Sequence, residues 1–523
     1  MGVDLLLVAL SGTLLLASAP PIDFHWLAWI ALVPALLPIL RGSALRAFLV
    51  PLAAWYLFDV THARWMLRIE GIHVLNFGLP VVVHAAYFGV FGLIARWFHR
   101  RAPQWDPVTF PAAWVVLEYL RFHLGFLSFP WGILGVSQHS VLPVAGVAAI
   151  TGVHGVSFLL VTSNTVLAGL IDARLPDAGR PLRRAATIPR RLGACAGAAL
   201  GVMLLAAASS RGPDAPVPTL RVALVQLEAR PPARPGVRRD ELFERYAELT
   251  RRAAASEPEL IAWSESSVRG SIPYDRTLAR DLANLARTSG AYLLVGSSAQ
   301  EKAERERRAP RASNSAFLIA PDGSFAGRYD KMRLLPFNEY LPLRGLIRWP
   351  SWIVSEVTDA EPGREATRFD MGRARFGVLI CWENLFPDAF RRMAAQGVDF
   401  MVSMTNEAFI DSAEARHQML AMNVFRAIEN RVAIVRTATT GVSAIIEPSG
   451  RVVERIRGDH GDDVNVRGYL VGEVPLVSER TFYTRHGEWF VVACTGLLLI
   501  VAAAHAGWAR REAARIGMAD REP

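Results

Sequence analysis

Cys381 is the only cysteine in the polar part of the chain, because Cys195 and Cys494 lie inside apolar runs. It follows the apolar run Phe376–Ile380, and Pro387 after it suits the first turn of a helix. A cysteine between a strand end and a helix start has its thiolate favoured by the helix dipole, which makes Cys381 a candidate nucleophile. A buried structural cysteine is the competing interpretation, and for a lone cysteine it is the commoner one.

Two charged residues in similar positions favour the catalytic interpretation. Glu265 follows the apolar run Leu260–Trp263, and Lys331 follows an apparent hairpin. Each residue alone is more often a simple surface charge. Together with Cys381 they would supply a base, a cation and a nucleophile at strand ends of one α/β domain, which is the set needed for nucleophilic catalysis.

The composition points to a membrane protein. Of the 523 residues 52% are hydrophobic and 20% are charged, and the formal net charge is +9. The basic residues stand mainly beside apolar runs, which is typical of membrane-flanking charge and not of a nucleic-acid-binding face. Three cysteines are too few for a disulfide framework. Because no histidine cluster has ligand spacing and no glycine-rich phosphate loop is present, we expect neither metal nor cofactor.

Eight apolar segments have about the length of a membrane-spanning helix. They are residues 3–20, 24–40, 45–60, 74–97, 108–124, 145–171, 191–209 and 488–508. The first segment could instead be a cleaved signal peptide, but it lacks a basic flank and another apolar segment follows at once, so we favour an uncleaved span.

Arginines set the expected orientation. They gather at residues 41–46, 96–101, 174–191 and 510–521, which an even number of spans places on one side of the membrane. The positive-inside rule makes that side the cytoplasm. We therefore expect a transmembrane domain of about seven helices at 1–209, an exported catalytic domain at 210–487, and a last span with a basic cytoplasmic tail at 488–523.

Residues 210–487 have the pattern of one soluble α/β domain. Helix-like stretches at about 240–255, 276–288 and 413–430 alternate with short apolar runs, and the charged segment Glu301–Arg311 suits a solvated loop. The runs predicted as strands are Leu220–Leu227, Leu260–Trp263, Tyr292–Gly296, Ala316–Ala320, Phe376–Ile380, Phe400–Met404, Val432–Thr437 and Val442–Ile446.

Glu265, Lys331 and Cys381, in this order and in these contexts, resemble the Glu-Lys-Cys triad of the nitrilase superfamily. The closer resemblance is to its membrane-bound branch, the apolipoprotein N-acyltransferases, and it extends over nearly the whole chain. It implies a multi-span helical membrane domain joined to a four-layer αββα sandwich. Further matches are Asn314, Leu334–Pro342, Trp382, Glu383, Phe386–Pro387, Asn406, Arg426–Arg431, Trp114, Glu118, Arg121, Phe129–Trp131, Gly135–Gln138, Gly155–Phe158 and Asn164.

The resemblance implies acyl transfer in two steps at the outer face of a bacterial inner membrane. The Cys381 thiolate would take an acyl chain from a phospholipid as a thioester, and the amino terminus of a diacylglyceryl-cysteine lipoprotein would then accept it. Glu265 would be the general base and Lys331 would stabilise the oxyanion. A membrane-tethered amide hydrolase, an acyltransferase with another acceptor and an inactive membrane or binding protein are the alternatives.

Several residues are expected to support this site. The resemblance gives supporting places to Asn314 and Trp382, and to Glu339 and Glu383 as carboxylates near Lys331. Glu383 could instead cap the helix that follows it.

Four residues are candidates for lipid contact. Arg121 could hold a phospholipid phosphate, or it could form a structural ion pair with Glu118 three residues earlier. Trp349 and Trp352 lie in the apolar, lightly basic segment Leu343–Ile353, which suits either a membrane-facing lid or a packed core loop.

Four departures from the family pattern also stand out. Leu227–Glu228 replaces the usual Gly-Asn, Ser264 replaces a proline, Asn406–Phe409 lacks a tryptophan, and Thr439 replaces an asparagine.

Overall fold

The structure is a computed structural model. It describes residues 2–69, 74–175, 201, 217–228, 239–300, 312–350, 357 and 359–519, apart from positions 269, 273 and 478. The predicted span at 191–209 falls outside the described residues except for position 201, and the predicted loop Glu301–Arg311 falls outside them entirely.

The chain divides into two compact units. One comprises Met1–Arg64, Phe77–Ser209 and Glu488–Pro523, and the other comprises Trp65–Asn76 and Ser210–Gly487. We call them the helical unit and the catalytic unit. The helical unit therefore includes the C-terminal helix, and the catalytic unit takes in a short segment from the amino-terminal part of the chain.

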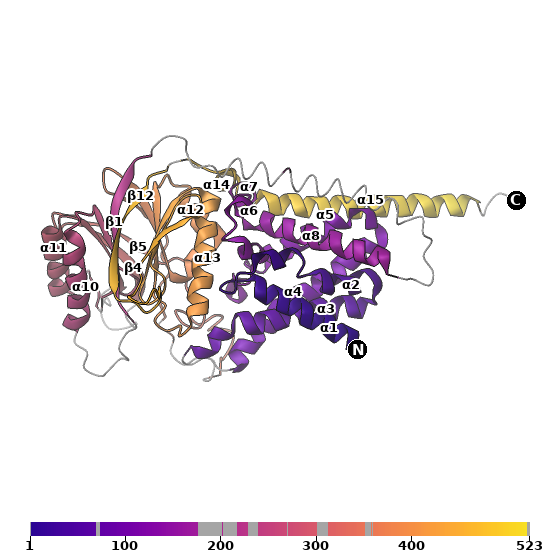
Figure 1. The fold of residues 1–523 in the computed structure, drawn as a ribbon, viewed down its shortest axis with the longest axis horizontal. Coiled ribbons are helices and arrows are strands. Elements are labelled where there is room, and N and C mark those ends of the chain that lie inside the picture. The colour runs from indigo at the N-terminus through magenta and orange to yellow at the C-terminus, as the bar shows by residue number, and fades with distance from the viewer. Residues whose placement is uncertain are drawn as a thin grey trace. The chain divides into compact units, whose positions relative to one another are not determined.

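Apolar helices build the helical unit (Figure 1). They are α1 (Gly2–Ser18), α2 (Val33–Arg41), α3 (Ala44–His62), α4 (Val74–Arg101), α5 (Asp106–Leu120), α6 (Leu142–Ala145), α7 (Ala148–Thr151), α8 (Val153–Arg174) and α15 (Trp489–Ala519). Four helical stretches within the described residues are long and apolar enough to cross a membrane: Ala44–His62, Pro80–Arg101, Val153–Arg174 and Trp489–Trp508. The number of eight spans remains a prediction.

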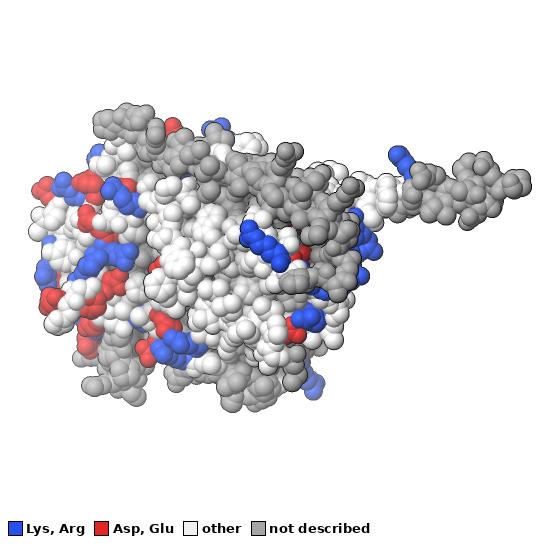
Figure 2. All heavy atoms as spheres, turned by 45° about the vertical axis from the view of Figure 1, so that its right-hand side comes forward, with Lys and Arg blue, Asp and Glu red and all other residues white. Residues whose placement is uncertain are grey.

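The exposed surface of the helical unit is largely apolar. Leu6, Val492 and Ile500 are each about two-thirds exposed although they are large hydrophobic residues. On the face that Figure 2 shows, charged side chains gather over the catalytic unit, and uncharged atoms dominate the described part of the helical bundle. An exposed apolar surface of this kind is what a helix bundle presents to lipid.

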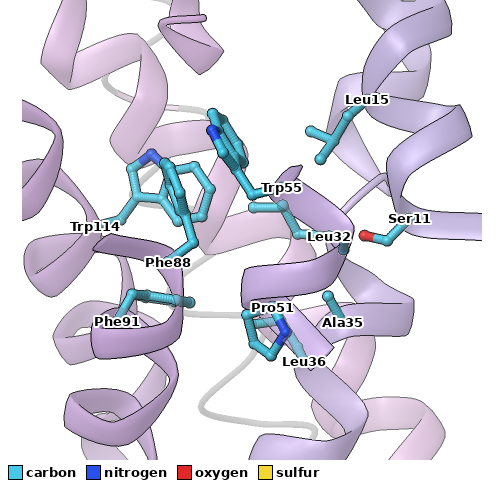
Figure 3. Close-up of a pocket in the computed structure, with 11 residues that line it drawn as sticks. Ser11, Leu15, Leu32, Ala35, Leu36, Pro51, Trp55, Phe88, Phe91 and Trp114 are labelled. Atoms are coloured by element: carbon cyan, nitrogen blue, oxygen red, sulfur yellow. The ribbon is translucent and has the colours of Figure 1, made fainter. Parts of the chain in front are cut away.

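Aromatic packing fills the interior of the helical unit. Trp55 of α3 stacks on Phe88 of α4, with ring centroids 3.6 Å apart, and Trp114 of α5 meets Trp55 edge-on at 5.3 Å. These rings line one side of a small pocket (Figure 3). The other lining residues are Ser11, Leu15, Leu32, Ala35, Leu36, Pro51, Ala54 and Phe91.

Two six-stranded sheets form the centre of the catalytic unit. The strands are β1 (Thr219–Gln226), β2 (Leu260–Ala262), β3 (Tyr292–Gln300), β4 (Ala312–Ile319), β5 (Phe325–Asp330), β6 (Arg368–Asp370), β7 (Arg375–Ile380), β8 (Phe400–Thr405), β9 (Ala433–Ala438), β10 (Ala444–Ile446), β11 (Val452–Arg455) and β12 (Gly468–Pro475). The sheet orders are β12-β1-β2-β3-β4-β5 and β11-β10-β9-β8-β7-β6.

All eight predicted strands are present, and the structure adds β5, β6, β11 and β12. The added strands are short or partly exposed, so they lack the continuous apolar run that marks a buried strand.

Helices cover the outer faces of both sheets. α10 (Arg239–Ala254) and α11 (Arg276–Ser289) pack on the first sheet, and α12 (Pro387–Ala394) and α13 (Ala413–Asn430) pack on the second. A short helix, α14 (Phe482–His486), follows β12 and contacts α12 and α13. Figure 1 shows the two sheets between these helix pairs. The unit is therefore the αββα sandwich that the resemblance implied.

Strand direction explains why the candidate residues meet. β7, β8 and β9 are parallel, with Ile380 opposite Met404 and Thr405 opposite Ala438. β1, β2 and β3 are also parallel. The carboxyl ends of parallel strands lie at one edge of a sheet, so the residues directly after β7 and β8 lie near each other. Glu265, which follows β2 in the other sheet, reaches the same edge, because the backbone N–H of Asn406 after β8 donates to it.

Candidate active site

Cys381 lies at the end of β7, where the chain turns sharply. It is the first residue of a 3₁₀ helix, Cys381–Leu385, and α12 follows with Pro387 in its first turn, as predicted. Cys381 has φ of +54° and is 7% exposed. A positive φ is uncommon for a residue with a side chain, and such strained positions cluster at functional sites.

Glu265 follows β2 and is held by two donors. Asn314 Nδ2 donates to Oε1 at 2.7 Å, and the backbone N–H of Asn406 donates to Oε2 at 2.7 Å. Burial raises the pKa of Glu265, and the Lys331 ammonium offsets part of that rise. A carboxylate whose pKa is raised toward neutrality is better suited to accept a proton than an ordinary glutamate.

Lys331 follows β5 in the predicted hairpin, whose strands β4 and β5 are antiparallel. Its side chain is 1% exposed, and Nζ lies 2.8 Å from Glu339 Oε2. Burial alone would lower the pKa of Lys331, but the carboxylates of Glu339 and Glu265, together with a Cys381 thiolate once it forms, outweigh burial and raise it. The ammonium therefore stays charged inside the protein, where it can stabilise a developing negative charge.

Asn314 and Glu339 connect the base to the cation. Asn314 Nδ2 also donates to Glu339 Oε1 at 3.0 Å, so one amide group bridges both carboxylates. The backbone N–H of Leu335 donates to Glu339 Oε2 at 2.7 Å. Glu339 is thus the carboxylate next to Lys331 that the sequence analysis sought.

Glu383 joins the lysine-bearing segment to the cysteine turn. It is fully buried and accepts from Tyr329 Oη at 2.9 Å and from the backbone N–H groups of Met332, Arg333 and Ile380 at 2.8, 2.9 and 3.0 Å. The bond from Ile380 caps the 3₁₀ helix, and the other bonds fix the chain after Lys331. α12, the helix that follows Glu383, has no side-chain cap bond, so the expected capping of that helix is wrong, and the supporting role near Lys331 remains a prediction.

The state of the thiol differs from the expectation drawn from helix position. Burial raises the pKa of Cys381 well above its ordinary value, the nearby Glu265 raises it further, and Lys331 only partly opposes them. A 3₁₀ helix of five residues provides too small a dipole to outweigh this desolvation. Burial and the charge of Glu265 both favour the neutral thiol over the thiolate, so a base is needed to activate Cys381.

Trp382 follows the cysteine and is partly buried. Its ring meets Phe386 edge-on, with centroids 5.6 Å apart. Its backbone N–H follows the nucleophile directly in the chain, which is the usual origin of one oxyanion-stabilising donor.

Glu118 supports the interior of the helical unit. Trp114 Nε1 donates to Oε1 at 3.3 Å, the backbone N–H of Leu134 donates to the same oxygen at 3.1 Å, and His154 Nδ1 lies 3.0 Å from Oε2. This carboxylate therefore connects α5, α8 and the segment that includes Leu134.

Arg121 is directed toward a different part of that segment. Nη2 donates to the carbonyl of Gly132 at 3.1 Å, and the guanidinium lies 5.2 to 5.7 Å from the ring centroids of Phe122, Phe88 and Trp55. The residue is 1% exposed, and within the described residues Nε and Nη1 have no hydrogen-bond partner. Burial over aromatic rings supports a structural role for Arg121.

The segment proposed as a lid is only partly described, because Trp352 lies outside the described residues. Trp349 Nε1 donates to the carbonyl of Pro342 at 2.6 Å, and its ring meets Phe337 edge-on at 5.0 Å. Leu346, which lies between Pro342 and Trp349 in the chain, is 84% exposed. Trp349 thus anchors an outward-facing apolar loop.

Four residues around Glu265 were given no role by the sequence patterns. The Ser264 hydroxyl lies 2.8 Å from Tyr246 Oη and 2.9 Å from Thr439 Oγ1, and Asn406 contacts Glu265 through its backbone. Ser264 and Thr439 are two of the four departures from the family pattern, and the structure places them in contact. Their pairing could have been suspected only from the fold, because 175 positions separate them.

Comparison with known proteins shows which family the chain resembles. A profile described as the apolipoprotein N-acyltransferase N-terminal domain matches residues 11–166, and a carbon-nitrogen hydrolase profile matches residues 221–475. An apolipoprotein N-acyltransferase of Geobacter metallireducens is 33% identical over 96% of this chain and 95% of its own length. Apolipoprotein N-acyltransferase 2 of Treponema pallidum is 26% identical over 92% of each chain.

Among solved structures, Nit3 of Saccharomyces cerevisiae, a member of branch 10 of the nitrilase superfamily, is 19% identical with a TM-score of 0.38. The match covers 49% of this chain and 90% of that chain. Identity of one third with the Geobacter protein, over nearly the whole of both sequences, establishes the relationship. The chain belongs to the apolipoprotein N-acyltransferase family.

Proposed function

We propose that the chain transfers an acyl chain from a phospholipid, through a thioester on Cys381, to the amino terminus of a diacylated lipoprotein. Membership of the family supports N-acylation of lipoproteins by an inner-membrane protein. The convergence of Cys381, Glu265 and Lys331 is the observation that carries the covalent mechanism.

In the first step the Cys381 sulfur attacks the ester carbonyl carbon of the phospholipid. The thiol proton passes to Glu265 as the C–S bond forms, and the ammonium of Lys331 stabilises the negative oxygen. The carbon–oxygen ester bond then breaks, and the leaving lysophospholipid oxygen takes the proton from Glu265. The products are a thioester and a lysophospholipid.

In the second step the neutral α-amine of the lipoprotein attacks the thioester carbonyl carbon. Glu265 accepts a proton from the amine as the C–N bond forms, and Lys331 again stabilises the oxyanion. The C–S bond breaks, and the sulfur receives the proton back from Glu265. An amide is formed and the enzyme returns to its starting state.

Both substrates are lipids, so the site must receive them from the membrane. The arginine-rich loops favour a periplasmic location for the catalytic unit. Leu346 and its exposed neighbours follow Glu339 in the chain, and we propose that this loop, with Trp349 and Trp352, enters the headgroup region. Arg121 remains our candidate for phosphate contact because two of its N–H groups are unused, with Glu118 holding the segment around it.

The test uses the purified full-length protein in detergent or nanodiscs. It receives phospholipid with a labelled acyl chain, and mass spectrometry follows the mass of the protein and of a diacylated lipopeptide. We expect a hydroxylamine-sensitive acyl adduct that requires Cys381 and chases into triacylated lipopeptide. Cys381→Ser should form no thioester. Release of free fatty acid without acylated lipopeptide would identify a hydrolase instead.

A further inference from the structure

A pair of opposite charges lies fully buried behind the candidate active site. Glu407 follows β8 by two residues, and Arg436 is in the middle of β9. Both side chains are 0% exposed, and Glu407 Oε1 forms an ion pair with Arg436 Nη2. Removing two charges from water costs several kcal/mol per ion in typical proteins, and apolar residues often replace such pairs without loss of stability. The pair therefore requires an explanation other than simple stabilisation.

Glu407, one member of the pair, fixes the segment after β8 whose backbone holds Glu265. Thr405 Oγ1 donates to Glu407 Oε1 at 2.9 Å, so the residues on either side of Asn406 are tied to each other. The backbone N–H of Asn406 is the donor that holds Glu265 Oε2 at 2.7 Å. The direction of that N–H, and with it the position of the base, depends on the anchoring of Glu407.

Arg436, the other member of the pair, is linked to Cys381 by hydrogen bonds through two asparagines. Arg436 Nη1 donates to Asn423 Oδ1 at 2.9 Å, and Asn423 Nδ2 donates to the carbonyl of Asn384 at 3.5 Å. Asn384 Nδ2 donates at 3.2 Å to the carbonyl of Cys381 itself. A chain of hydrogen bonds thus runs from Arg436 to the turn in which Cys381 has its positive φ.

Close packing holds the carboxylate in this place. A Cβ atom on Gly441 would lie 1.9 Å from Glu407 Oε2, so only glycine leaves room for the carboxylate. Arg436 Nε donates to the carbonyl of the next residue, Val442, at 3.1 Å. The loop after β9 therefore encloses the pair, and neither charged group can move without moving the backbone.

We propose that Glu407 and Arg436 are a positioning pair that sets the distance between Glu265 and Cys381. The inference rests on the proposed acyl transfer for its kinetic test. Neither residue touches the reacting atoms. The pair connects the turn after β8, which holds the base, to the turn after β7, which carries the nucleophile.

The experiment compares Glu407→Gln with Glu429→Gln. Glu429 forms an equally buried ion pair with Arg426 within α13, with Nε and Oε2 2.7 Å apart. This pair reaches the 3₁₀ helix of Cys381 only at its last residue, where Arg426 Nη1 donates to the carbonyl of Leu385 at 3.0 Å, and it makes no described bond to the chain that holds Glu265. Both variants remove one charge from a buried pair, so both should lower the melting temperature. We expect only Glu407→Gln to lower the rate of thioester formation, by about tenfold to a hundredfold, with KM for phospholipid within twofold of wild type.

Arg436→Lys provides a second variant, because it keeps the charge but cannot make the three bonds of the guanidinium. We expect the same kcat loss, and we expect the double variant with Glu407→Gln to be little worse than either single variant. A Glu429→Gln enzyme that loses kcat as severely as Glu407→Gln, or a loss expressed only in KM, would overturn the proposal.

Alkylation of Cys381 by iodoacetamide separates this inference from the proposed function, because the reagent needs no lipid. The pH profile of alkylation should change in Glu407→Gln and not in Glu429→Gln, since only the former disturbs the base beside the thiol. Unchanged profiles in both variants would refute the positioning role. A wild-type protein that forms no acyl adduct would refute the acyl transfer, while the alkylation profiles would still decide on the pair.

Discussion

Replacing Glu339 by glutamine should move the acid limb of the pH–rate profile to lower pH. The substitution keeps the shape of the side chain and removes the negative charge that lies 2.8 Å from the Lys331 ammonium. Burial contributes most to the raised pKa of Glu265, and the charge of Glu339 adds to it. Without that charge the pKa of Glu265 falls, so the base is ionised at lower pH and the acid limb shifts downward.

The size of the shift in the acid limb follows from the distance between Glu265 and Glu339, which share the side-chain amide of Asn314. Glu265 Oε1 and Glu339 Oε1 lie 2.7 and 3.0 Å from the same Asn314 nitrogen, so the two oxygens are within about 6 Å of each other. Two unit charges at that distance repel by about 3 kcal/mol at an effective dielectric constant of about 20, which corresponds to about two pKa units. Because the ammonium of Lys331 screens part of this repulsion, we expect the acid limb to shift by about one unit.

The lost charge also acts on Lys331. The charge of Glu339 helps to raise the pKa of Lys331 against its burial, so its loss lowers that pKa. Because the pKa of Lys331 is raised so far, the ammonium stays charged across the assay range, and we expect only the acid limb to move. The maximal rate should also fall, by about tenfold to a hundredfold, because the ammonium loses the carboxylate that orients it toward the oxyanion.

Single-turnover thioester formation from a fluorescent phospholipid, measured from acid to alkaline pH, checks this result. Glu259→Gln is the matched control, because Glu259 pairs with Arg373 at the surface of the same unit. Its profile should coincide with that of wild type. If the acid limb of Glu339→Gln stays in place or moves upward, the electrostatic account of the base is incorrect.

Three further substitutions test other parts of the structure. Glu383→Gln should lower the free energy of unfolding by about 2 kcal/mol and abolish activity, because an amide NH₂ would face buried N–H donors. Chemical denaturation measures the change in the free energy of unfolding. Gly132→Ala should cost about 1 to 2 kcal/mol in a thermal-shift assay, because φ is +67° and its Cβ would lie 3.2 Å from Phe58. Leu346→Asp should raise KM for phospholipid severalfold with an unchanged melting temperature, because the side chain is 84% exposed; an unchanged KM would argue against lipid contact.

Much of the catalytic unit could be predicted because its strands are buried on both faces. A strand covered on both sides is a continuous apolar run, so β7 and β8 are visible in the sequence together with the residues that follow them. Cys381 and Asn406 are therefore recognisable as strand-end residues. Their contact partners depend on the sheet order, which no local pattern encodes.

The groups that surround Glu265, Lys331 and Cys381 could not be predicted for a different reason. The contact of Asn406 with Glu265 is made by a backbone N–H, which every residue except proline possesses. Glu407 and Arg436 are charged, and composition places such residues at the surface, whereas both are fully buried. A sequence pattern shows only which amino acid stands at a position. It cannot show that a backbone N–H holds a carboxylate, or that a charged side chain is buried.

The same limit applies to Glu118 and Arg121 in the helical unit. Their spacing of three residues places them on one helix face, which favours an ion pair. However, α5 ends at Leu120, and Arg121 donates to the carbonyl of Gly132 while Glu118 accepts from the backbone of Leu134.

Both bonds join the end of α5 to the same returning segment, two residues apart. Because a backbone carbonyl needs a donor and a backbone N–H needs an acceptor, the segment inside the apolar bundle needs one donating and one accepting side chain, and here Arg121 donates and Glu118 accepts. The opposite charges of Glu118 and Arg121 are thus explained by the polarity of the backbone that they bind, and attraction between the two side chains is not needed to account for their presence.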